Sequence, residues 1–485
     1  MTDKLNLHLL QTGLPGLDAL LGGGLPELSF NIIGGAPGSG KTTFAQQLMF
    51  ALAGPDCKAL FFTALGEPPV KMLRYQQQFS FFDFDKVDSS VKFISLAPEV
   101  QEGNYDKILA QIMSEVQAHA PSLIFIDSFR SVIHGAKGDQ QEANVLQSFV
   151  QQLSMLMTGW QATTFLIGEY LDKETDTNPI FTVADGIVWL SQNVQRNAMV
   201  RKIQVMKMRG QAQRPGLHTF RINRSGIEIF PRLIAAADPS AADAPRPGAQ
   251  GRVSMGVAAL DAMLGGGLPI GYSLLLTGPS GSGKTVLATE FLAEAGRCGE
   301  TAVLALFEKS PSQMMNDKLD VMVRSGQVGL LNMRTLDLSI DETLHELVLM
   351  IDRMKATRVV FDSLSGFELA LAPEFREDFR ESLYRMITVL NDKGVTLLMT
   401  TEMEDRFTEL RFTPYGNALL VDAIIMQRYV EAKGQFKTVI AVVKLRGSAH
   451  SRDLRLFEID DDGIVIGAAP VSCEGVLAGR SQAPA

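Results

Sequence analysis

The sequence predicts an α/β fold of two tandem domains, each a mainly parallel sheet flanked by helices. Three observations predict it: a set of motifs that occurs twice, short apolar runs that alternate with longer amphipathic ones, and glycine-rich loops between a predicted strand and a predicted helix. Strands that are almost continuously apolar need cover on both faces, which is typical of a parallel sheet with helices on either side.

The chain repeats itself once. Residues 12–26 read TGLPGLDALLGGGLP and residues 255–269 read MGVAALDAMLGGGLP; residues 35–42 read GAPGSGKT and residues 278–285 read GPSGSGKT. Both pairs are separated by 243 residues. This period is far longer than the roughly 20–50 residues of a solenoid repeat, so it indicates a duplicated domain.

The domain boundaries follow from this repeat. We predict a first domain over residues 1–234 and a second over residues 251–467. Residues 235–250 read AAADPSAADAPRPGAQ, a stretch rich in small residues and proline without apolar periodicity, which predicts an extended linker. Residues 468–485 are similarly small and polar and are predicted to form a flexible tail.

Composition restricts the class of protein. The chain has 485 residues, of which 46% are hydrophobic, so it can bury large cores. A formal charge of −9 argues against a nucleic-acid or membrane surface as the partner. Three scattered cysteines give neither a disulfide framework nor a metal cluster. We see no signal peptide and no apolar run of about 18 residues, so we expect a cytoplasmic protein.

Apolar runs place the strands in each half. In the first half, strands are predicted at Leu28–Ile33, Ala59–Thr63, Val91–Leu96, Leu123–Asp127, Thr163–Ile167, Gly186–Leu190 and Ile203–Met206. In the second half, they are predicted at Ser273–Thr277, Ala302–Phe307, Val359–Asp362, Thr396–Met399, Ala423–Gln427 and Val439–Val443. Helical patterns lie between them, for example Thr42–Ala53 and Thr285–Ala295.

Both copies contain G-x-x-x-x-G-K-[ST] between a predicted strand and a predicted helix, the context expected of a phosphate-binding loop. Glycines let the backbone N–H groups point at phosphates, and the next helix adds its positive end. Lys41 and Lys284 are predicted to reach the β- and γ-phosphates. The alternative is a flexible glycine turn. The predicted nucleotide-binding residues are Gly35, Gly38, Ser39, Gly40, Lys41, Thr42, Thr43, Gly278, Gly281, Ser282, Gly283, Lys284, Thr285 and Val286.

A nucleotide site also needs an acidic anchor for Mg²⁺ at the end of a neighbouring strand. Asp127 ends LIFID and Asp362 ends RVVFD. An aspartate after four apolar residues is costly to bury unless a cation or hydrogen bonds satisfy it. We therefore predict Mg²⁺ ligands at Thr42, Asp127, Thr285 and Asp362. The alternative is a helix N-cap beside the serine that follows each aspartate.

Hydrolysis further requires a base or a group that orients water. The loop after the second strand contains Glu67 in the first half and Glu308 in the second, which are our candidates. The alternative for each is a solvated loop glutamate. Two later strands end at Glu169 and Glu402, which could sense the γ-phosphate or simply end the strand.

The last motif is K-x-R-G, at residues 207–210 and 444–447, each after an apolar strand. Two cations one residue apart at the end of a strand project to the same side of a sheet. Such charge can act in trans on a neighbour's γ-phosphate. The alternative is an exposed basic turn. The predicted catalytic cations are Lys207, Arg209, Lys444 and Arg446.

Taken together, these motifs resemble the KaiC family of tandem RecA-like P-loop ATPases. The resemblance covers nearly the whole chain and rests on TGLPGLD…GGGLP, both phosphate loops, IDS, FDS, TTE, VDAIIMQRYVE at 421–431 and both K-x-R-G turns. It implies ATP and Mg²⁺ as cofactors and an ATP-dependent homohexamer of two stacked rings, with nucleotide at subunit boundaries. It also implies that the K-x-R-G cations reach a neighbour's phosphate, and that regulation acts through a protein partner.

This sequence departs from the family pattern in two places. Each half has one glutamate where the family has an adjacent pair, and Ala418-Leu419 stands where a Ser-Thr phosphoacceptor pair would fall. Our leading hypothesis is an ATPase ring that couples ATP binding and slow hydrolysis to a partner. Three alternatives stay open: a Ser/Thr kinase or autokinase with Glu308 as base, a RecA-type ATPase acting on DNA, and a non-catalytic assembly module.

Overall fold

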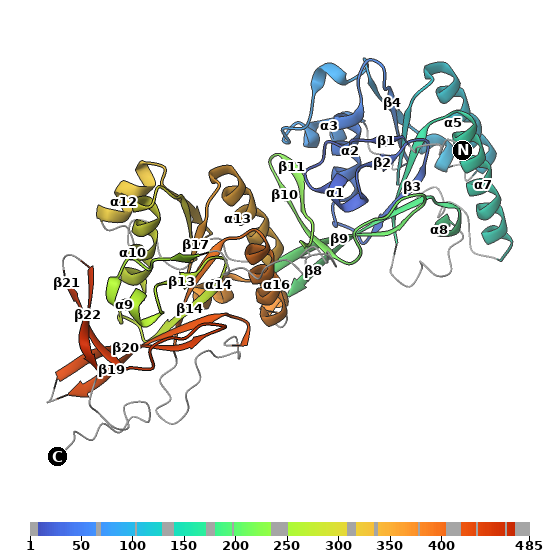
Figure 1. The fold of residues 1–485 in the computed structure, drawn as a ribbon. Coiled ribbons are helices and arrows are strands. Elements are labelled where there is room, and N and C mark those ends of the chain that lie inside the picture. Colours follow the sequence, from blue (N-terminus) through green and yellow to red (C-terminus); the bar gives the residue numbers. More distant parts are fainter. Residues whose placement is uncertain are drawn as a thin grey trace, which may run out of the picture. The chain divides into compact units, whose positions relative to one another are not determined.

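A computed structural model gives the fold of most of the chain. It describes residues 8–64, 69–101, 104–128, 140–170, 180–195, 198–233, 251–307, 317–333, 338–376, 379–403, 419–432, 435–460 and 463–470. The chain divides into two compact units, one up to Arg232 and one from Leu233 onwards (Figure 1). The predicted linker, residues 235–250, lies outside the described residues. Within the described part, no helix is both long and apolar enough to span a bilayer.

The first unit contains one large sheet and one small two-stranded sheet. Its strands are β1 Leu9–Leu10, β2 Leu25–Pro26, β3 Phe30–Gly35, β4 Ala59–Thr63, β5 Val91–Ser95, β6 Leu123–Asp127, β7 Thr163–Glu169, β8 Gly186–Gln195, β9 Ala198–Met208, β10 His218–Asn223 and β11 Gly226–Phe230. Its helices are α1 Leu17–Leu21, α2 Lys41–Leu52, α3 Pro69–Gln76, α4 Ala97–Gln101, α5 Tyr105–His119, α7 Gln140–Gly159 and α8 Ile180–Val183, with a 3₁₀ turn at Phe84–Lys86.

The second unit repeats this plan. Its strands are β12 Arg252–Val253, β13 Leu268–Pro269, β14 Ser273–Gly278, β15 Ala302–Leu306, β16 Val328–Asn332, β17 Arg358–Asp362, β18 Thr396–Glu402, β19 Ala423–Ala432, β20 Gln435–Leu445, β21 Arg455–Asp460 and β22 Gly463–Pro470. Its helices are α9 Ala258–Met263, α10 Lys284–Arg297, α12 Asp317–Arg324, α13 Ile340–Met354, α14 Leu364–Ala370, α15 Pro373–Arg376 and α16 Phe379–Asp392. Strand β22 runs three residues into the predicted tail, the rest of which is not described.

Both large sheets have nine strands in the same order, β5-β4-β6-β7-β3-β8-β9-β10-β11 and β16-β15-β17-β18-β14-β19-β20-β21-β22. The first six strands of each order are parallel and the last three antiparallel. The predicted α/β class, with mainly parallel sheets flanked by helices, is confirmed. The phosphate-loop strand, β3 or β14, lies inside the sheet, and each loop therefore follows a fully buried strand.

Each sheet carries a hydrophobic core on both faces, because successive strand residues point to opposite sides. Ile33 and Phe61 pack into the cluster that includes α1 and α2. Their neighbours Ile32 and Phe62 pack into the cluster that includes α5 and α7. The second unit is built in the same way, with one cluster under α9 and α10 and another under α13 and α16. This double cover explains the continuously apolar strand sequences.

In the first unit, the GLD…GGGLP segment forms a turn that is held by its aspartate and by a distant loop. Asp18 Oδ1 accepts hydrogen bonds from Thr12 N at 3.0 Å and from Thr12 Oγ1 at 2.7 Å. Gln211, directly after the first K-x-R-G motif, donates from Nε2 to Leu21 O at 2.7 Å and to Gly24 O at 2.9 Å. The glycine turn therefore fastens the segment that follows the paired cations.

Candidate functional site

The two glycine loops lie where their parallel strands end and the next helix begins. The loop glycines adopt left-handed backbone angles, with φ of 74° at Gly38, 102° at Gly40, 79° at Gly281 and 96° at Gly283. Helices α2 and α10 then start directly at the motif lysines. Their first N–H groups have no partner within the helix and, with the helix dipole, form an anion site at each loop.

A side chain in place of the glycine before each lysine would be strained and would displace an isoleucine. A Cβ at Gly40 would lie 2.8 Å from Ile222 Cδ1, and one at Gly283 would lie 2.5 Å from Ile459 Cδ1. These contacts come on top of the cost of a left-handed φ for any residue with a Cβ. The loop backbone therefore has a shape that strongly favours glycine at these two positions.

Each motif lysine is buried and folds back over its loop. Lys41 Nζ donates to Ala36 O at 2.8 Å. Lys284 Nζ donates to Gly278 O at 2.9 Å and to Pro279 O at 2.8 Å. Burial lowers the pKa of Lys41, while the carboxylates of Glu169 and Asp127 act in the opposite direction. An ammonium group held by carbonyl oxygens over a ring of N–H groups fits a phosphate chain, which would replace those oxygens as its partner.

A hydroxyl and a carboxylate meet beside each loop. Thr42 Oγ1 donates to Asp127 Oδ2 at 2.7 Å, and Thr285 Oγ1 donates to Asp362 Oδ2 at 2.9 Å. Both aspartates end the parallel strand that lies two places from the loop strand in the sheet. Oxygen ligands of this kind suit Mg²⁺, which is usually held by one or two carboxylates together with substrate phosphates. The residues therefore fit an Mg²⁺–nucleotide.

The N-cap alternative for Asp362 does not apply, because the neighbouring serine takes that role. Ser363 Oγ accepts a hydrogen bond from Gly366 N at 3.0 Å at the start of α14. The carboxylate of Asp362 is left to the hydroxyls of Thr285 and Thr400, the latter through a short hydrogen bond.

The two aspartates differ in their surroundings. Thr400 occupies the position next to the loop strand that Ile167 occupies in the first unit, so Asp127 has no matching second hydroxyl. Burial raises the pKa of Asp127 to about 6, although the hydroxyl of Thr42 and the charge of Lys41 both lower it. A cation at this corner would relieve that cost directly.

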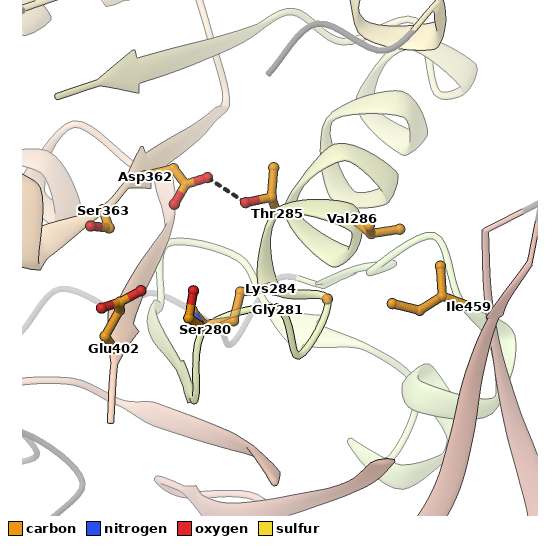
Figure 2. A pocket seen from close by; sticks show the side chains of 10 residues that line it. Ser280, Gly281, Lys284, Thr285, Val286, Asp362, Ser363, Glu402 and Ile459 are labelled. Carbon is orange, nitrogen blue, oxygen red and sulfur yellow. Dashed lines mark hydrogen bonds between the residues drawn. The ribbon is translucent and has the colours of Figure 1, made fainter. Parts of the chain in front are cut away.

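The second site opens into a cavity of about 440 Å³ (Figure 2). In the figure, the side chains of Asp362 and Thr285 point towards each other above the loop, and Glu402 faces the same space. Glu402 and Ser363 join the loop residues in its wall. The carboxylate of Glu402 thus lines the cavity. This position is the one expected if Glu402 senses the γ-phosphate. The candidate bases Glu67 and Glu308 lie outside the described residues.

The K-x-R-G cations are held together in both units. Lys207 Nζ donates to Thr182 O at 3.2 Å, and Arg209 Nη2 donates to the same carbonyl at 3.4 Å. In the second unit, Lys444 Nζ donates to Val421 O at 2.7 Å and Arg446 Nη2 to Leu419 O at 2.7 Å. Each pair therefore points to one short segment that precedes β8 or β19.

These positive charges lie near one another, and burial is the larger influence on the lysines. Burial lowers the pKa of Lys207, and the charge of Arg209 lowers it further. The same two causes, burial and then the charge of Arg446, lower the pKa of Lys444. About half of each arginine side chain is exposed, 58% for Arg209 and 51% for Arg446. Both arginines can accept an anionic partner from outside.

Two aspartates that sequence reasoning missed organise this end. Asp185 Oδ1 pairs with Arg209 Nη1 at 2.9 Å, and its Oδ2 accepts from Phe30 N at 3.0 Å. Asp422 Oδ1 pairs with Arg446 Nη1 at 3.5 Å, and its Oδ2 accepts from Ser273 N at 3.0 Å. A sequence signal exists: in both halves this aspartate directly precedes a strand and stands 24 residues before the arginine.

These contacts place the cations at the opposite end of the sheet from the loop of their own unit. Asp185 contacts the first residue of β3, whereas the glycine loop follows its last residue, Gly35. At about 3.3 Å per residue in a parallel strand, the two ends of β3 are roughly 17 Å apart. Arg209 and Lys207 therefore face away from the loop of their own unit.

The fold and these loops define a P-loop protein, with one such loop in each unit. The family model for "ATPase: KaiC" matches residues 10–234 and 253–471, so the chain belongs to the KaiC ATPase family. The resemblance drawn from the motifs is thereby confirmed.

Relatives match over nearly the full chain. The chain is 28% identical over 489 residues to "Circadian clock protein KaiC3" of Synechocystis sp. (strain ATCC 27184 / PCC 6803 / Kazusa), covering 98% of this chain and 94% of the relative. It is 27% identical to "Circadian clock oscillator protein KaiC" of Picosynechococcus sp. (strain ATCC 27264 / PCC 7002 / PR-6), covering 97% and 92%. A KaiC of Rippkaea orientalis (strain PCC 8801 / RF-1) is also 27% identical, over 97% and 91%.

Proposed function

We propose that this protein is a Mg²⁺-dependent ATPase that binds ATP in both units and assembles into an ATP-dependent homohexamer of two stacked rings. In this proposal, hydrolysis is slow and the nucleotide state is passed to a regulatory protein partner. The observation that carries the proposal is the placement of the K-x-R-G cations. They lie at the far end of the sheet from the loop of their own unit and cannot serve that loop, and in this proposal a neighbouring copy of the chain brings them to a phosphate.

The chain's own groups have distinct tasks in this mechanism. Bound ATP–Mg²⁺ supplies an activated phosphoanhydride and neutralises part of its charge. Backbone N–H groups of the loops bind the phosphates, and Lys41 and Lys284 add positive charge. Thr42 and Asp127 would hold Mg²⁺ in the first unit, and Thr285 and Asp362 would hold it in the second. A neighbour's Arg209 or Arg446 then stabilises charge that develops on the transferred group, and Glu308 and Glu67 are the proposed bases.

Hydrolysis is favoured over self-phosphorylation at the family position. Residue 418 lies outside the described residues, and Leu419, which follows it, carries no hydroxyl and exposes 67% of its surface. We therefore take water as the proposed acceptor of the phosphoryl group.

The test is a mixing experiment between two inactive variants. A chain with Arg209→Ala and Arg446→Ala keeps its loops, and a chain with Lys41→Ala and Lys284→Ala keeps its cations. We expect each alone to lose at least about tenfold in phosphate release, and the mixture to recover part of it, because some boundaries join two intact halves. Solution mass with and without ATP–Mg²⁺ reports assembly in the same samples.

Arg324→Ala is the matched control, since this arginine lies on the surface of α12 with 80% of its side chain exposed and pairs only with Asp320 in the described contacts. It should leave phosphate release unchanged. Strict absence of recovery in mixed assemblies would show that each site is completed within one chain and would overturn the proposal.

A further inference from the structure

The first unit has a further pocket beside the proposed Mg²⁺ ligands Thr42 and Asp127, which form part of its wall. Its volume is about 230 Å³. It lies between helices α2 and α3 over strands β4 and β6. The residues that line it are Thr42, Thr43, Gln46, Phe61, Thr63, Met72, Tyr75, Gln76, Phe79 and Asp127.

Several polar atoms in this wall are buried without a partner among the described residues. They are the Nε2 of Gln46, the Oγ1 of Thr63 and both side-chain atoms of Gln76. These side chains are only 2%, 6% and 3% exposed. Buried amides and hydroxyls are almost always hydrogen-bonded, so three such groups around one cavity indicate that its occupant supplies the missing partners.

The duplicated unit shows that the phosphate loop itself does not need these groups. Thr63 pairs in register with Asp127, and Leu306 takes the same place beside Asp362. Counting from the motif lysines, the helix position of Gln46 is taken by Thr289, whose hydroxyl donates to Thr285 O at 2.9 Å. At the position of Thr63 the second unit therefore has an apolar side chain. At the position of Gln46 it has a hydroxyl that is hydrogen-bonded within its own helix.

The wall chemistry restricts the occupant. Phe61, Phe79, Tyr75 and Met72 offer flat aromatic and thioether surfaces, and the glutamine amides both donate and accept hydrogen bonds. Asp127 is the one carboxylate among the lining residues, which include no lysine or arginine. A planar heterocycle that stacks on aromatic rings and pairs its edge with amides suits such a wall, whereas an anion does not.

We propose that this pocket binds an uncharged aromatic heterocycle of nucleobase size. Because the pocket shares Thr42 and Asp127 with the proposed Mg²⁺ site of the first unit, the bound heterocycle touches the first nucleotide site and not the second. In that regulatory role the inference rests on the proposed ATPase function. The binding itself depends only on the residues of the pocket.

The experiment uses the full chain with both phosphate loops saturated by Mg²⁺ and a non-hydrolysable ATP analogue. Adenine, uracil and nicotinamide are titrated separately, and binding is followed by saturation-transfer NMR. We expect at least one of the three to bind, and Gln76→Leu and Gln46→Leu each to weaken it at least about tenfold, because each removes one amide partner. Thr289→Val, the matched change in the second unit, should leave the dissociation constant unchanged.

A further variant guards against misfolding. Gln46→Thr combined with Thr63→Leu copies the second unit and should abolish binding while the melting temperature is kept. Absence of binding by all three heterocycles, or equal binding by wild type and the variants, would show a pocket that holds only solvent and would overturn the inference. Affinity for a fluorescent ATP analogue is measured on the same samples, so a failure of the proposed ATPase function is seen separately.

Discussion

At the scale of single residues, burial of the Asp127 carboxylate costs free energy. Its pKa is about 6 because the carboxyl is buried, against an ordinary value of 3.8. Because the pKa is raised in the folded state, the contribution of this carboxyl to the free energy of unfolding is greatest below about pH 4. That contribution is lost as the pH rises towards 6. The loss is about 3 kcal/mol at most, and less to the extent that solvent enters the open site.

Asp127→Asn should therefore stabilise the nucleotide-free protein at pH 7 and flatten its stability between pH 4 and 6. At the same time it should remove the stabilisation that ATP–Mg²⁺ gives this unit, because a metal ligand is lost. Thermal unfolding across this pH range, with and without ATP–Mg²⁺, measures both effects. Asp362→Asn is the comparison: each carboxylate oxygen accepts from a hydroxyl, and the amide NH2 cannot replace one of these acceptors, so this variant should not stabilise. A lower melting temperature for Asp127→Asn at pH 7 would contradict the argument.

Arg358 is a second residue with a large expected effect. Its side chain is 1% exposed, pairs with Glu300 Oε2 at 2.8 Å, donates to Ser254 O at 2.8 Å and lies 5.0 Å from the Phe291 ring centre. Arg358→Ala should cost about 3–5 kcal/mol, because it leaves Glu300 without its cation and opens a cavity.

The matched variant is Arg358→Leu, which installs the residue found at the corresponding position of the first unit, Leu123. Glu300 loses its cation in both variants, but the leucine should cost clearly less than the alanine because it fills the cavity. Urea unfolding of the full chain, followed for the second unit, measures the difference. Equal losses for the two variants would show that the charge, and not the packing, dominates.

At the scale of elements, the turn that carries K-x-R-G depends on one aspartate in each unit. Asp185→Ala and Asp422→Ala remove the carboxylate that orients Arg209 or Arg446. If the cations act at a neighbour's site, phosphate release should fall about tenfold or more while ATP affinity stays within about twofold. Asp453→Ala, which removes the carboxylate partner of Arg455, is the control and should change neither quantity. A loss of ATP affinity in the two variants would point to a folding defect instead.

The elements also show what sequence reasoning could and could not predict. Strands β4 and β6 begin and end where their apolar runs predict, because these runs are buried on both faces and bounded by polar residues. Strands β10, β11, β16, β21 and β22, which lie at or next to the edges of the sheets, were not predicted, since sequences such as HTFRIN mix polar and apolar residues without a long run.

Within the site, the glycine loops and the Thr–Asp pairs followed from local motifs. Asp185 and Asp422 did not, because their partners lie on other strands, far away in the sequence. The polar pocket behind Thr42 was missed for the same reason: Gln46 and Gln76 come from different helices, and nothing in either helix alone indicates that they share a cavity.

At the scale of the whole molecule, each unit has its own two-sided core. The four hydrophobic clusters of the described residues divide two and two between the units. Residues 1–232 and residues 233–485, expressed separately, should therefore each fold and unfold cooperatively. Circular dichroism and urea unfolding test this, and failure of either half to fold alone would show that its stability depends on the other.

Within one unit, the cations and the phosphate loop lie at opposite ends of the sheet, so the two ends offer different groups to a neighbouring chain. In the proposed assembly, one end of each sheet supplies a guanidinium and the other end needs one, so two chains would join through unlike surfaces. An open oligomer of such chains would have one phosphate loop at one end that no neighbour's cations reach. At its other end it would have one pair of cations with no neighbouring phosphate. Only a closed ring would satisfy every loop and every pair of cations. An open oligomer of any length would have the same two unsatisfied ends.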